Sequence, residues 1–226
     1  VLEIGPGLGV LTEGLLARGA DVTAVEKDSR LAGRLAESLG RPAHLRVVTA
    51  DALELDWDAF LSHGPDAAFP APASGSCFAA CVSNLPYSVG TRILLDAALS
   101  AAAPARFVIL VQTEVAERFA ARPGDPARGQ AGVWLQLDYS VTTVREVKAA
   151  CFWPRPEVGS TIVRLDRKPA PSLTAAEREA FFALTRFTFM YRRKQMGSSL
   201  RKAAPPPLAC PPEKLLARFA RAAADP

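Results

Sequence analysis

The stretch that decides the fold is Val1-Leu-Glu-Ile-Gly-Pro-Gly-Leu-Gly9. An apolar run ends there in a turn with glycines at positions 5, 7 and 9, and a helical pattern follows. Glycines in such a turn let the backbone approach a ligand, and amides at a helix start can donate hydrogen bonds to it. The dinucleotide fingerprint needs its third glycine where Val10 stands, so the spacing disfavours a nicotinamide cofactor. Taken alone, the stretch also fits a tight turn that binds nothing.

Beyond this stretch, short β-branched runs alternate with helical patterns, which indicates an α/β fold with a parallel sheet. The predicted strands are 1–4, 21–26, 45–50, 77–83 and 106–112, and the predicted helices are 9–18, 29–39, 89–101 and 113–121. Segments 141–148 and 158–166 alternate like strands and should close the sheet antiparallel. Residues 63–76, rich in Gly, Pro, Ala and Ser, are predicted to form a surface loop.

A change of pattern near Pro169 and Pro171 marks the end of this sheet. A helix should then begin near Thr174, because Thr174-Ala-Ala-Glu177 has the spacing of a capping box. We therefore expect a larger α/β domain over 1–168 and a small helical domain over 172–226. The chain has 226 residues, of which 49% are hydrophobic, enough for one good-sized core and a small appendage.

Composition excludes several classes of protein. No uninterrupted apolar run is long enough to span a bilayer, so we expect no membrane association. The cysteines at 77, 81, 151 and 210 match neither a disulfide framework nor, with His44 and His63, a zinc site, so we expect no metal. Buried thiols in a reducing cytoplasm fit them better. Because the chain begins at Val1 inside a predicted strand, we also expect its natural N-terminus to lie upstream.

Basic residues are concentrated near the C-terminus. The net charge of +4 is small, but residues 186–202 contain six basic side chains and no acidic one. A local basic surface of this kind suits a nucleic-acid backbone. A solvated helix face is an equally good interpretation of the segment by itself.

Polar residues stand at or just after the carboxyl ends of three predicted strands. Glu26 closes the second strand, where a carboxylate can accept hydrogen bonds from both ribose hydroxyls of a nucleoside ligand. Asp51 follows the third strand and could accept from an adenine amino group, or could cap a helix instead. Asn84-Leu-Pro-Tyr87 follows the strand 77–83. Ligands of doubly wound sheets lie at the carboxyl ends of the strands, so these groups and Gly5 should gather at one edge.

With these motifs, the chain resembles the KsgA-type family of ribosomal RNA adenine dimethyltransferases. The matching segments run in order through nearly the whole chain: E-I-G-P-G-L-G at 3–9, N-L-P-Y at 84–87, Q-T-E-V-A-E-R at 112–118, F-W-P-R-P-E-V at 152–158, S-T-I-V-R-L at 160–165 and Y-R-R-K-Q-M-G-S-S-L at 191–200. The resemblance implies a class I S-adenosylmethionine-dependent methyltransferase (Rossmann-like) fold with a small C-terminal helical domain. It also implies that a Q-N-F-L motif belongs upstream of Val1.

The resemblance further implies which residues do what. The methyl donor would be S-adenosylmethionine, and the substrate would be adjacent adenines near the 3′ end of small-subunit rRNA, met in the pre-ribosomal small subunit in the cytoplasm. We expect a monomer. The expected catalytic residues are Asn84, Leu85, Pro86, Tyr87 and Phe152. The expected donor-binding residues are Glu3, Gly5, Gly7, Gly9, Glu26, Lys27, Asp51, Ala52 and Asn84. The expected RNA-binding residues are Arg192, Arg193, Lys194, Arg201 and Lys202.

Positioning should carry most of the catalysis. The adenine amine is a poor nucleophile, and the Asn84 side-chain oxygen and the Leu85 carbonyl would accept its two hydrogens and aim its lone pair. Pro86 stiffens the turn, and Tyr87 offers a face on which an extruded base can stack. By resemblance Phe152 would cover the opposite face of the base, although a core aromatic beside a proline loop is a strong alternative.

Three other functions stay open. Related large-subunit rRNA methyltransferases of the macrolide-resistance type usually carry lysine where this chain has Leu8, so they rank second. A non-catalytic rRNA-binding assembly factor on the same fold would be free to lose Asn84, Tyr87 and Glu26, all of which are present. A nucleotide-dependent oxidoreductase is disfavoured by the glycine spacing.

Overall fold

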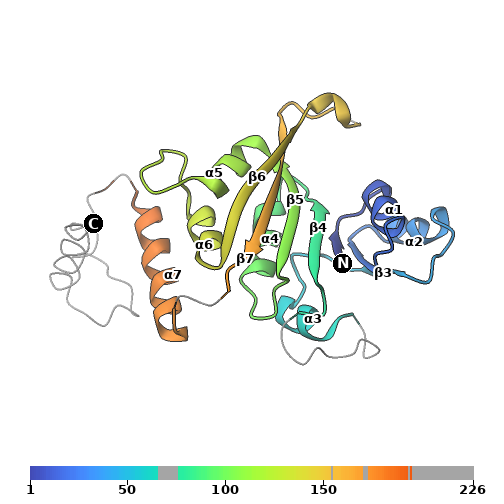
Figure 1. The fold of residues 1–226 in the computed structure, drawn as a ribbon, viewed down its shortest axis with the longest axis horizontal. Helices are drawn as coiled ribbons and strands as arrows, with labels where there is room; N and C mark the ends of the chain where they lie inside the picture. The colour runs from blue at the N-terminus through green and yellow to red at the C-terminus, as the bar shows by residue number, and fades with distance from the viewer. Residues whose placement is uncertain (66–75, 154, 170–172, 193, 195–226) are drawn as a thin grey trace. The chain divides into compact units, whose positions relative to one another are not determined.

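The computed structural model describes residues 1–65, 76–153, 155–169, 173–192 and 194. The chain divides into two compact units, Val1–Pro169 and Ala170–Pro226. The first unit holds a seven-stranded sheet in the order β3-β2-β1-β4-β5-β7-β6, shown in Figure 1. This arrangement confirms the predicted α/β, Rossmann-like fold class.

The strands agree closely with the predicted ranges. They are β1 (Leu2–Ile4), β2 (Val22–Glu26), β3 (Leu45–Thr49), β4 (Ala80–Asn84), β5 (Arg106–Gln112), β6 (Tyr139–Val147) and β7 (Ser160–Arg167). β1 to β5 pair in parallel, whereas β7 runs antiparallel to both β5 and β6. The sheet is thus closed by an antiparallel pair, as the alternating pattern predicts.

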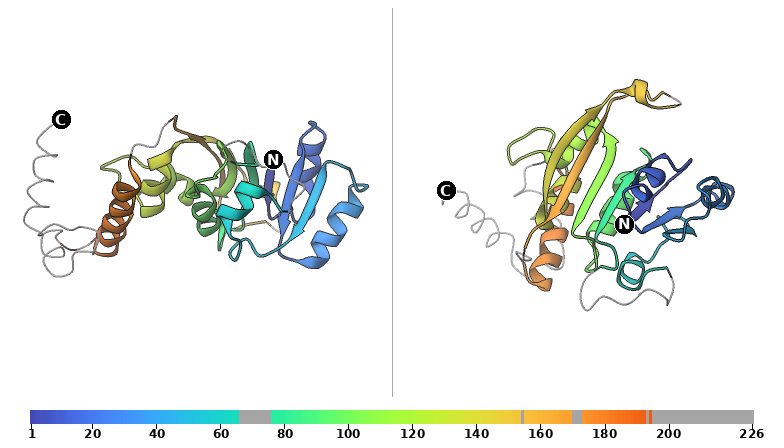
Figure 2. Two further views of the ribbon diagram at one scale, coloured as in Figure 1. Left: turned by 90° about the horizontal axis from the view of Figure 1, so that it is seen from below. Right: turned by 45° about the vertical axis from the view of Figure 1, so that its right-hand side comes forward.

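The helices connect the strands and cover the sheet. They are α1 (Val10–Leu16), α2 (Ser29–Ser38), α3 (Trp57–His63), α4 (Gly90–Ala98), α5 (Thr113–Ala120) and α6 (Gln130–Asp138), with a short 3₁₀ turn η1 (Ala149–Cys151). The helices α1 and α2 lie beside the β3 end of the sheet, and α5 and α6 lie beside β6 (Figures 1 and 2). No helix in the described ranges is both long enough and apolar enough to cross a bilayer.

Two helices were not predicted. Helix α3 begins after Asp56, whose Oδ1 accepts a hydrogen bond from the Ala59 amide at 3.0 Å, and it buries Trp57, Phe60 and Leu61. Its last residue is His63, so α3 overlaps the predicted loop 63–76 by one residue; residues 66–75 of that prediction lie outside the described residues. Helix α6 depends on tertiary packing, since Gly132 lies directly against the Arg118 carbonyl of α5. Neither segment shows a strong helical periodicity of apolar residues in the sequence, so neither helix was predicted.

Two further expectations need correction. The strand β4 starts at Ala80, three residues after the predicted start, and it includes Asn84 as its last residue. The expectation of buried thiols is wrong for Cys151, which is exposed on η1, while Cys77 is half-buried and Cys81 is buried. Cys210 lies outside the described residues.

The turn after β1 brings the backbone of α1 against α2. Gly9 caps α1 in the left-handed region, with φ of 85°. A Cβ atom at this position would lie 2.5 Å from Cδ1 of Leu35. Gly9 therefore allows two helices to pack closely, which is a different role from contact with a ligand.

The second unit is described only through α7 (Ala175–Met190) and its flanks. The Thr174 hydroxyl accepts from the Glu177 amide, and the Glu177 carboxylate accepts from the Thr174 amide at 2.8 Å. This is the predicted capping box, which is thus confirmed. Arg178 stacks over the Phe182 ring at 5.0 Å on the same helix.

Candidate active site

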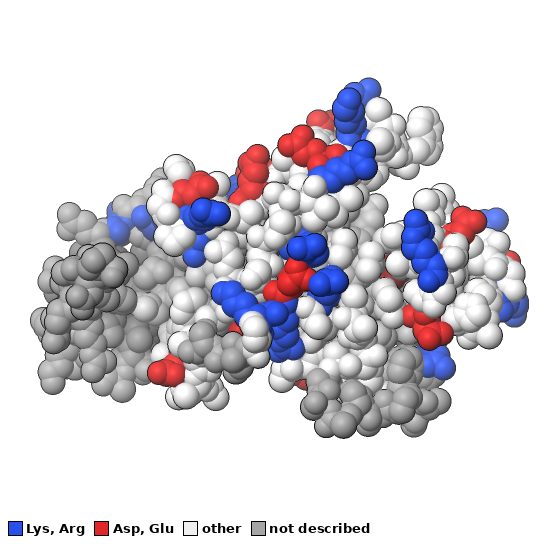
Figure 3. Space-filling model, viewed as in Figure 1, with Lys and Arg blue, Asp and Glu red and all other residues white. Residues whose placement is uncertain are grey.

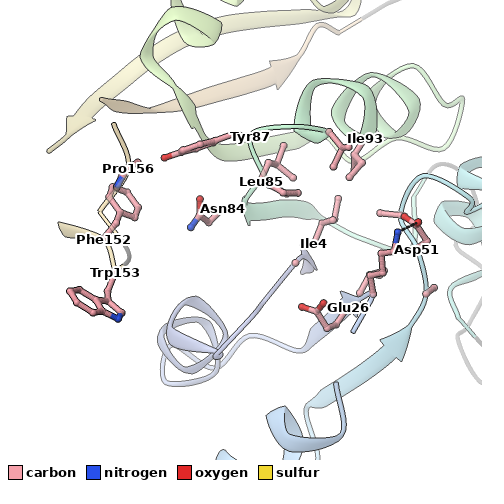
Figure 4. A pocket seen from close by; sticks show the side chains of 17 residues that line it. Ile4, Glu26, Asp51, Asn84, Leu85, Tyr87, Ile93, Phe152, Trp153 and Pro156 are labelled. Atoms are coloured by element: carbon pink, nitrogen blue, oxygen red, sulfur yellow. Dashed lines mark hydrogen bonds and ion pairs between the residues drawn. The ribbon is translucent and has the colours of Figure 1, made fainter. Parts of the chain in front are cut away.

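A pocket of about 530 Å³ opens at the carboxyl edge of the parallel strands. Each of the first four strands contributes to it where the strand ends: Gly5 after β1, Glu26 from β2, Asp51 after β3 and Asn84 from β4. Figure 4 shows Glu26 and Asp51 toward one end of the pocket, and Asn84, Tyr87 and Phe152 toward the other. The lining is completed by Ile4, Val25, Lys27, Ala50, Ala52, Leu85, Pro86, Val89, Ile93, Trp153 and Pro156.

The carboxylate of Glu26 is held in a fixed orientation. Its Oε2 accepts a hydrogen bond from the Gly7 amide at 3.2 Å, and its Oε1 accepts one from the Asp28 amide at 3.0 Å. The side chain is 8% exposed, at the pocket wall. Each carboxylate oxygen has a further acceptor site, so Glu26 can still accept hydrogen bonds from two neighbouring hydroxyls.

Asp51 is joined to Lys27 across the pocket rim. Asp51 Oδ2 accepts a hydrogen bond from Lys27 Nζ at 2.7 Å, and its Oδ1 accepts one from the Leu53 amide at 3.0 Å. The lysine contact lowers the pKa of Asp51 and raises that of Lys27. Asp51 thus closes a local turn instead of capping a helix, since Asp56 caps α3.

The turn 84–87 is fixed at three points. The Leu85 amide donates to the Leu110 carbonyl of β5 at 3.2 Å, and the Pro86 carbonyl accepts from the Gly90 amide at 2.7 Å. The Tyr87 hydroxyl lies 2.6 Å from the hydroxyl of Ser160 at the start of β7. No described group donates a hydrogen bond to the side-chain oxygen of Asn84 or to the carbonyl of Leu85. Two acceptors therefore lie together at the pocket with capacity left for a ligand.

The glycine turn and the 84–87 turn are tied together beneath the pocket. Ser83 Oγ, fully buried in β4, accepts a hydrogen bond from the Ile4 amide of β1 at 2.9 Å. Above it, Pro86 Cδ is the nearest atom to the Cβ position of Gly5, at 4.0 Å. These contacts hold the glycine turn next to the 84–87 turn at the pocket. Sequence reasoning missed Ser83, as it missed Ser160, because a serine within a strand carries no local sign of a cross-strand contact.

The loop between β6 and β7 forms the outer wall. Phe152 is half-buried and Pro156 lies beside it, while Trp153 is 97% exposed at the rim. Phe152 therefore lines the pocket and is not a core aromatic. Trp153 is a rim residue that sequence reasoning did not single out.

Three of the expected donor-binding residues do not line the pocket. Gly7 orients Glu26 through its amide, and Gly9 packs against α2, as described above. Glu3 is 1% exposed within the sheet, and its Oε2 has no hydrogen-bond partner among the described residues; the same holds for the buried Thr12 hydroxyl. Burial raises the pKa of Glu3 to about 7, and the Thr12 hydroxyl acts in the opposite direction. Of these three residues, only Gly7 makes a hydrogen bond to a side chain that lines the pocket.

The expected RNA-binding residues are only partly described. Arg192 and Lys194 are exposed just beyond α7, whereas Arg193, Arg201 and Lys202 lie outside the described residues. On the face shown in Figure 3, basic and acidic side chains are mixed. Some of the basic side chains are in ion pairs: Arg106 and Arg164 both pair with Asp166, at 2.6 and 2.7 Å. In the part of the chain that the structure describes, no group of three or more His, Cys, Asp or Glu side chains could hold a metal ion.

Comparison with known proteins decides the family. The family model for ribosomal RNA adenine dimethylase matches residues 1–208. The chain belongs to the ribosomal RNA adenine dimethylase family. Two curated relatives, each called ribosomal RNA small subunit methyltransferase A, are 41% identical to it: that of Opitutus terrae over 208 residues, and that of Thermobifida fusca over 205. These alignments cover 91% and 88% of this dimethylase-family chain.

The matched part is about two thirds of the relatives' own length. The alignments cover 69% of the Opitutus terrae protein and 66% of the Thermobifida fusca protein. The family assignment therefore rests on the α/β unit and the start of the second unit.

Solved structures agree with the family assignment. A dimethyladenosine transferase from Plasmodium falciparum superposes with a TM-score of 0.70 and 27% identity, covering 90% of this chain and 67% of that one. The 23S rRNA methyltransferase ErmE gives a TM-score of 0.64 and 30% identity, covering 89% and 74%. One neighbour is named as a dimethyladenosine transferase and the other as an rRNA methyltransferase. Both similarities support the methyltransferase fold of this dimethylase-family chain.

Proposed function

We propose that this chain transfers methyl groups from S-adenosylmethionine to the N6 amines of adjacent adenines near the 3′ end of small-subunit rRNA. The observation that carries the proposal is the shared pocket: Asn84 and Tyr87 line the same cavity as Glu26 and Asp51. One end can thus hold a nucleoside-type donor while the other holds the amine to be modified.

The residues at the Glu26 end fit such a donor. S-adenosylmethionine supplies an activated methyl group on a sulfonium centre. Glu26, fixed by two backbone amides, would accept hydrogen bonds from its ribose hydroxyls. Asp51 would accept from its adenine amine, and the backbone amide of Ala52 would donate to its ring. The apolar side chains of Ile4, Val25 and Ile93 provide a wall suited to an adenine face.

The residues at the Asn84 end fit the acceptor amine. The Asn84 side-chain oxygen and the Leu85 carbonyl would accept the two N6 hydrogens and thereby aim the lone pair into the pocket. Tyr87 and Phe152 would stack on the extruded base. The hydrogen bonds of Tyr87 to Ser160 and of Leu85 to Leu110 would help to hold the turn in this geometry.

Proton transfer needs no protein base in this scheme. The pocket lining contains no histidine, and the side chain of Asn84 cannot act as a base. The amine loses its proton only as the new bond forms, and the open pocket mouth gives water access to it. Catalysis would therefore come mainly from the positioning of the amine against the methyl donor.

The basic segment after α7 is the proposed contact for rRNA phosphates. Arg192 and Lys194 are exposed there, with Arg193, Arg201 and Lys202 close in the sequence. Contacts of this kind supply affinity that falls as salt rises. We infer a monomer acting in the cytoplasm on the pre-ribosomal small subunit.

The likeness to ErmE favours one second candidate, methylation of large-subunit rRNA. The test is to incubate the protein with radiolabelled S-adenosylmethionine and, separately, undermethylated small subunits and large subunits. Label should enter small-subunit rRNA and be recovered after digestion as N6,N6-dimethyladenosine at two adjacent positions. Label confined to large subunits would establish the second candidate, and no label on either would leave a non-catalytic binding role.

A further inference from the structure

Trp153 is the least buried large hydrophobic residue of the described chain. Its side chain is 97% exposed, and it makes no hydrogen bond to a described residue. By contrast, Trp57 is 6% exposed and Trp134 is half-buried. An indole combines a large apolar surface with a polar N–H, and tryptophan is for that reason enriched where proteins bind other molecules.

Trp153 also lines the mouth of the proposed active site. It follows Phe152, whose backbone is extended at φ −117° and ψ 150°, so the two side chains leave the loop in different directions. Figure 4 shows both on the loop that faces Asn84, with Trp153 farther from Tyr87 than Phe152 is. A nucleotide next to a base held between Tyr87 and Phe152 would therefore be within reach of the indole.

The charges around the loop suit an RNA strand. Lys148 and Arg155 flank the two aromatic residues in the sequence, and both are exposed. Neither is in an ion pair with another described residue. An aromatic face between basic side chains is the arrangement that single-stranded nucleic acids favour, because bases stack while phosphates are neutralised.

We propose that the Trp153 indole is a stacking platform for the nucleotide next to the target adenine. This inference rests on the proposed function. It makes Trp153 a positioning residue for the RNA substrate: it touches the neighbouring nucleotide and takes no part in holding the N6 amine or the methyl donor. Stacking is indifferent to base identity, so Trp153 would serve both methylations when the two adenines exchange places.

The test compares Trp153→Ala and Trp153→Phe with wild type on undermethylated small subunits. Trp153→Ala should raise KM for small subunits about 10- to 100-fold, the range expected for one lost stack, and Trp153→Phe should raise it less. The maximal rate, donor affinity and melting temperature should stay at wild-type values, because the side chain packs against nothing. Val158→Ala, on the same loop and 45% exposed, is the matched control and should change nothing.

Ultraviolet cross-linking identifies what the indole touches. Wild-type protein should give a covalent adduct between the Trp153 peptide and a nucleotide adjacent to the modified adenines. An adduct to a ribosomal protein, or an unchanged KM for Trp153→Ala in an active enzyme, would overturn the inference and leave the proposed function intact. Failure of wild-type protein to label small subunits would overturn both.

Discussion

The hydroxyl oxygen of Tyr87 lies 2.6 Å from the hydroxyl oxygen of Ser160. Tyr87 follows β4 and Ser160 begins β7, which are separated by β5 in the sheet. The bond therefore fastens the 84–87 turn to the antiparallel part of the sheet. It also fixes the position of the hydroxyl end of the tyrosine ring, on whose face we expect the target base to stack.

Tyr87→Phe should keep the stacking face and lose this tether. We expect the free energy of unfolding to fall by about 1 kcal/mol, the usual worth of one hydrogen bond, and turnover to fall several-fold as the ring gains freedom. Ser160→Ala should have the same two effects, and the double variant should be no worse than either. Urea unfolding and steady-state methylation measure both quantities; additive losses in the double variant would show that the two hydroxyls act independently.

Glu26→Gln should weaken donor binding. Hydrogen bonds to a charged acceptor are worth about 1.5–3 kcal/mol, so the dissociation constant for S-adenosylmethionine should rise about 10- to 100-fold by calorimetry. Glu13→Gln, an exposed acid in the first turn of α1, is the matched control and should leave the affinity unchanged. Equal affinities for Glu26→Gln and wild type would remove Glu26 from the ribose-binding role.

Glu3 should make the stability of the fold depend on pH. Its pKa is raised by burial from 4.5 to about 7, so the folded state holds the proton more tightly than the unfolded state. This contribution is fully present below pH 4.5 and is lost as pH rises through about 7. Glu3→Gln has no such loss, so its stability relative to wild type should improve by about 3 kcal/mol between acidic and mildly alkaline pH. Parallel curves of unfolding free energy against pH would contradict this.

Gly9→Ala should destabilise the protein. The new methyl group would meet Cδ1 of Leu35 at 2.5 Å on a backbone with φ of 85°, and strain of this kind costs about 1–3 kcal/mol. Gly33→Ala, in α2 where a Cβ meets no atom within 4 Å, should instead stabilise by about 0.5–1 kcal/mol. Thermal unfolding of both variants measures the contrast, and similar midpoints would argue against tight packing at Gly9.

Local sequence patterns predicted the site residues that lie at the ends of parallel strands. Glu26 and Asn84 each end a strand, and parallel strands share one carboxyl edge, so their meeting follows from the strand pattern alone. The capping box at Thr174 is equally local, because its partners are three residues apart. Ser160 could not be predicted, since its contact with Tyr87 spans 73 residues and depends on the register of an antiparallel pair.

The glycine turn shows a different limit. Its three glycines look alike in the sequence, yet only Gly5 lines the pocket, while Gly7 orients Glu26 and Gly9 packs against Leu35. Sequence spacing predicts that a chain turns tightly there. Which neighbour each glycine meets depends on the placement of α2 and β2, which no local pattern contains.

The central claim is that Asn84 positions an amine at the rim of a methyl-donor pocket. The most direct measurement is the single-turnover rate of methyl transfer by Asn84→Ala to undermethylated small subunits, with both substrates saturating. The rate should fall about 100- to 1,000-fold, as on removal of one pre-positioned polar group, while the dissociation constant for the small subunit stays near wild type. A wild-type rate would contradict the account.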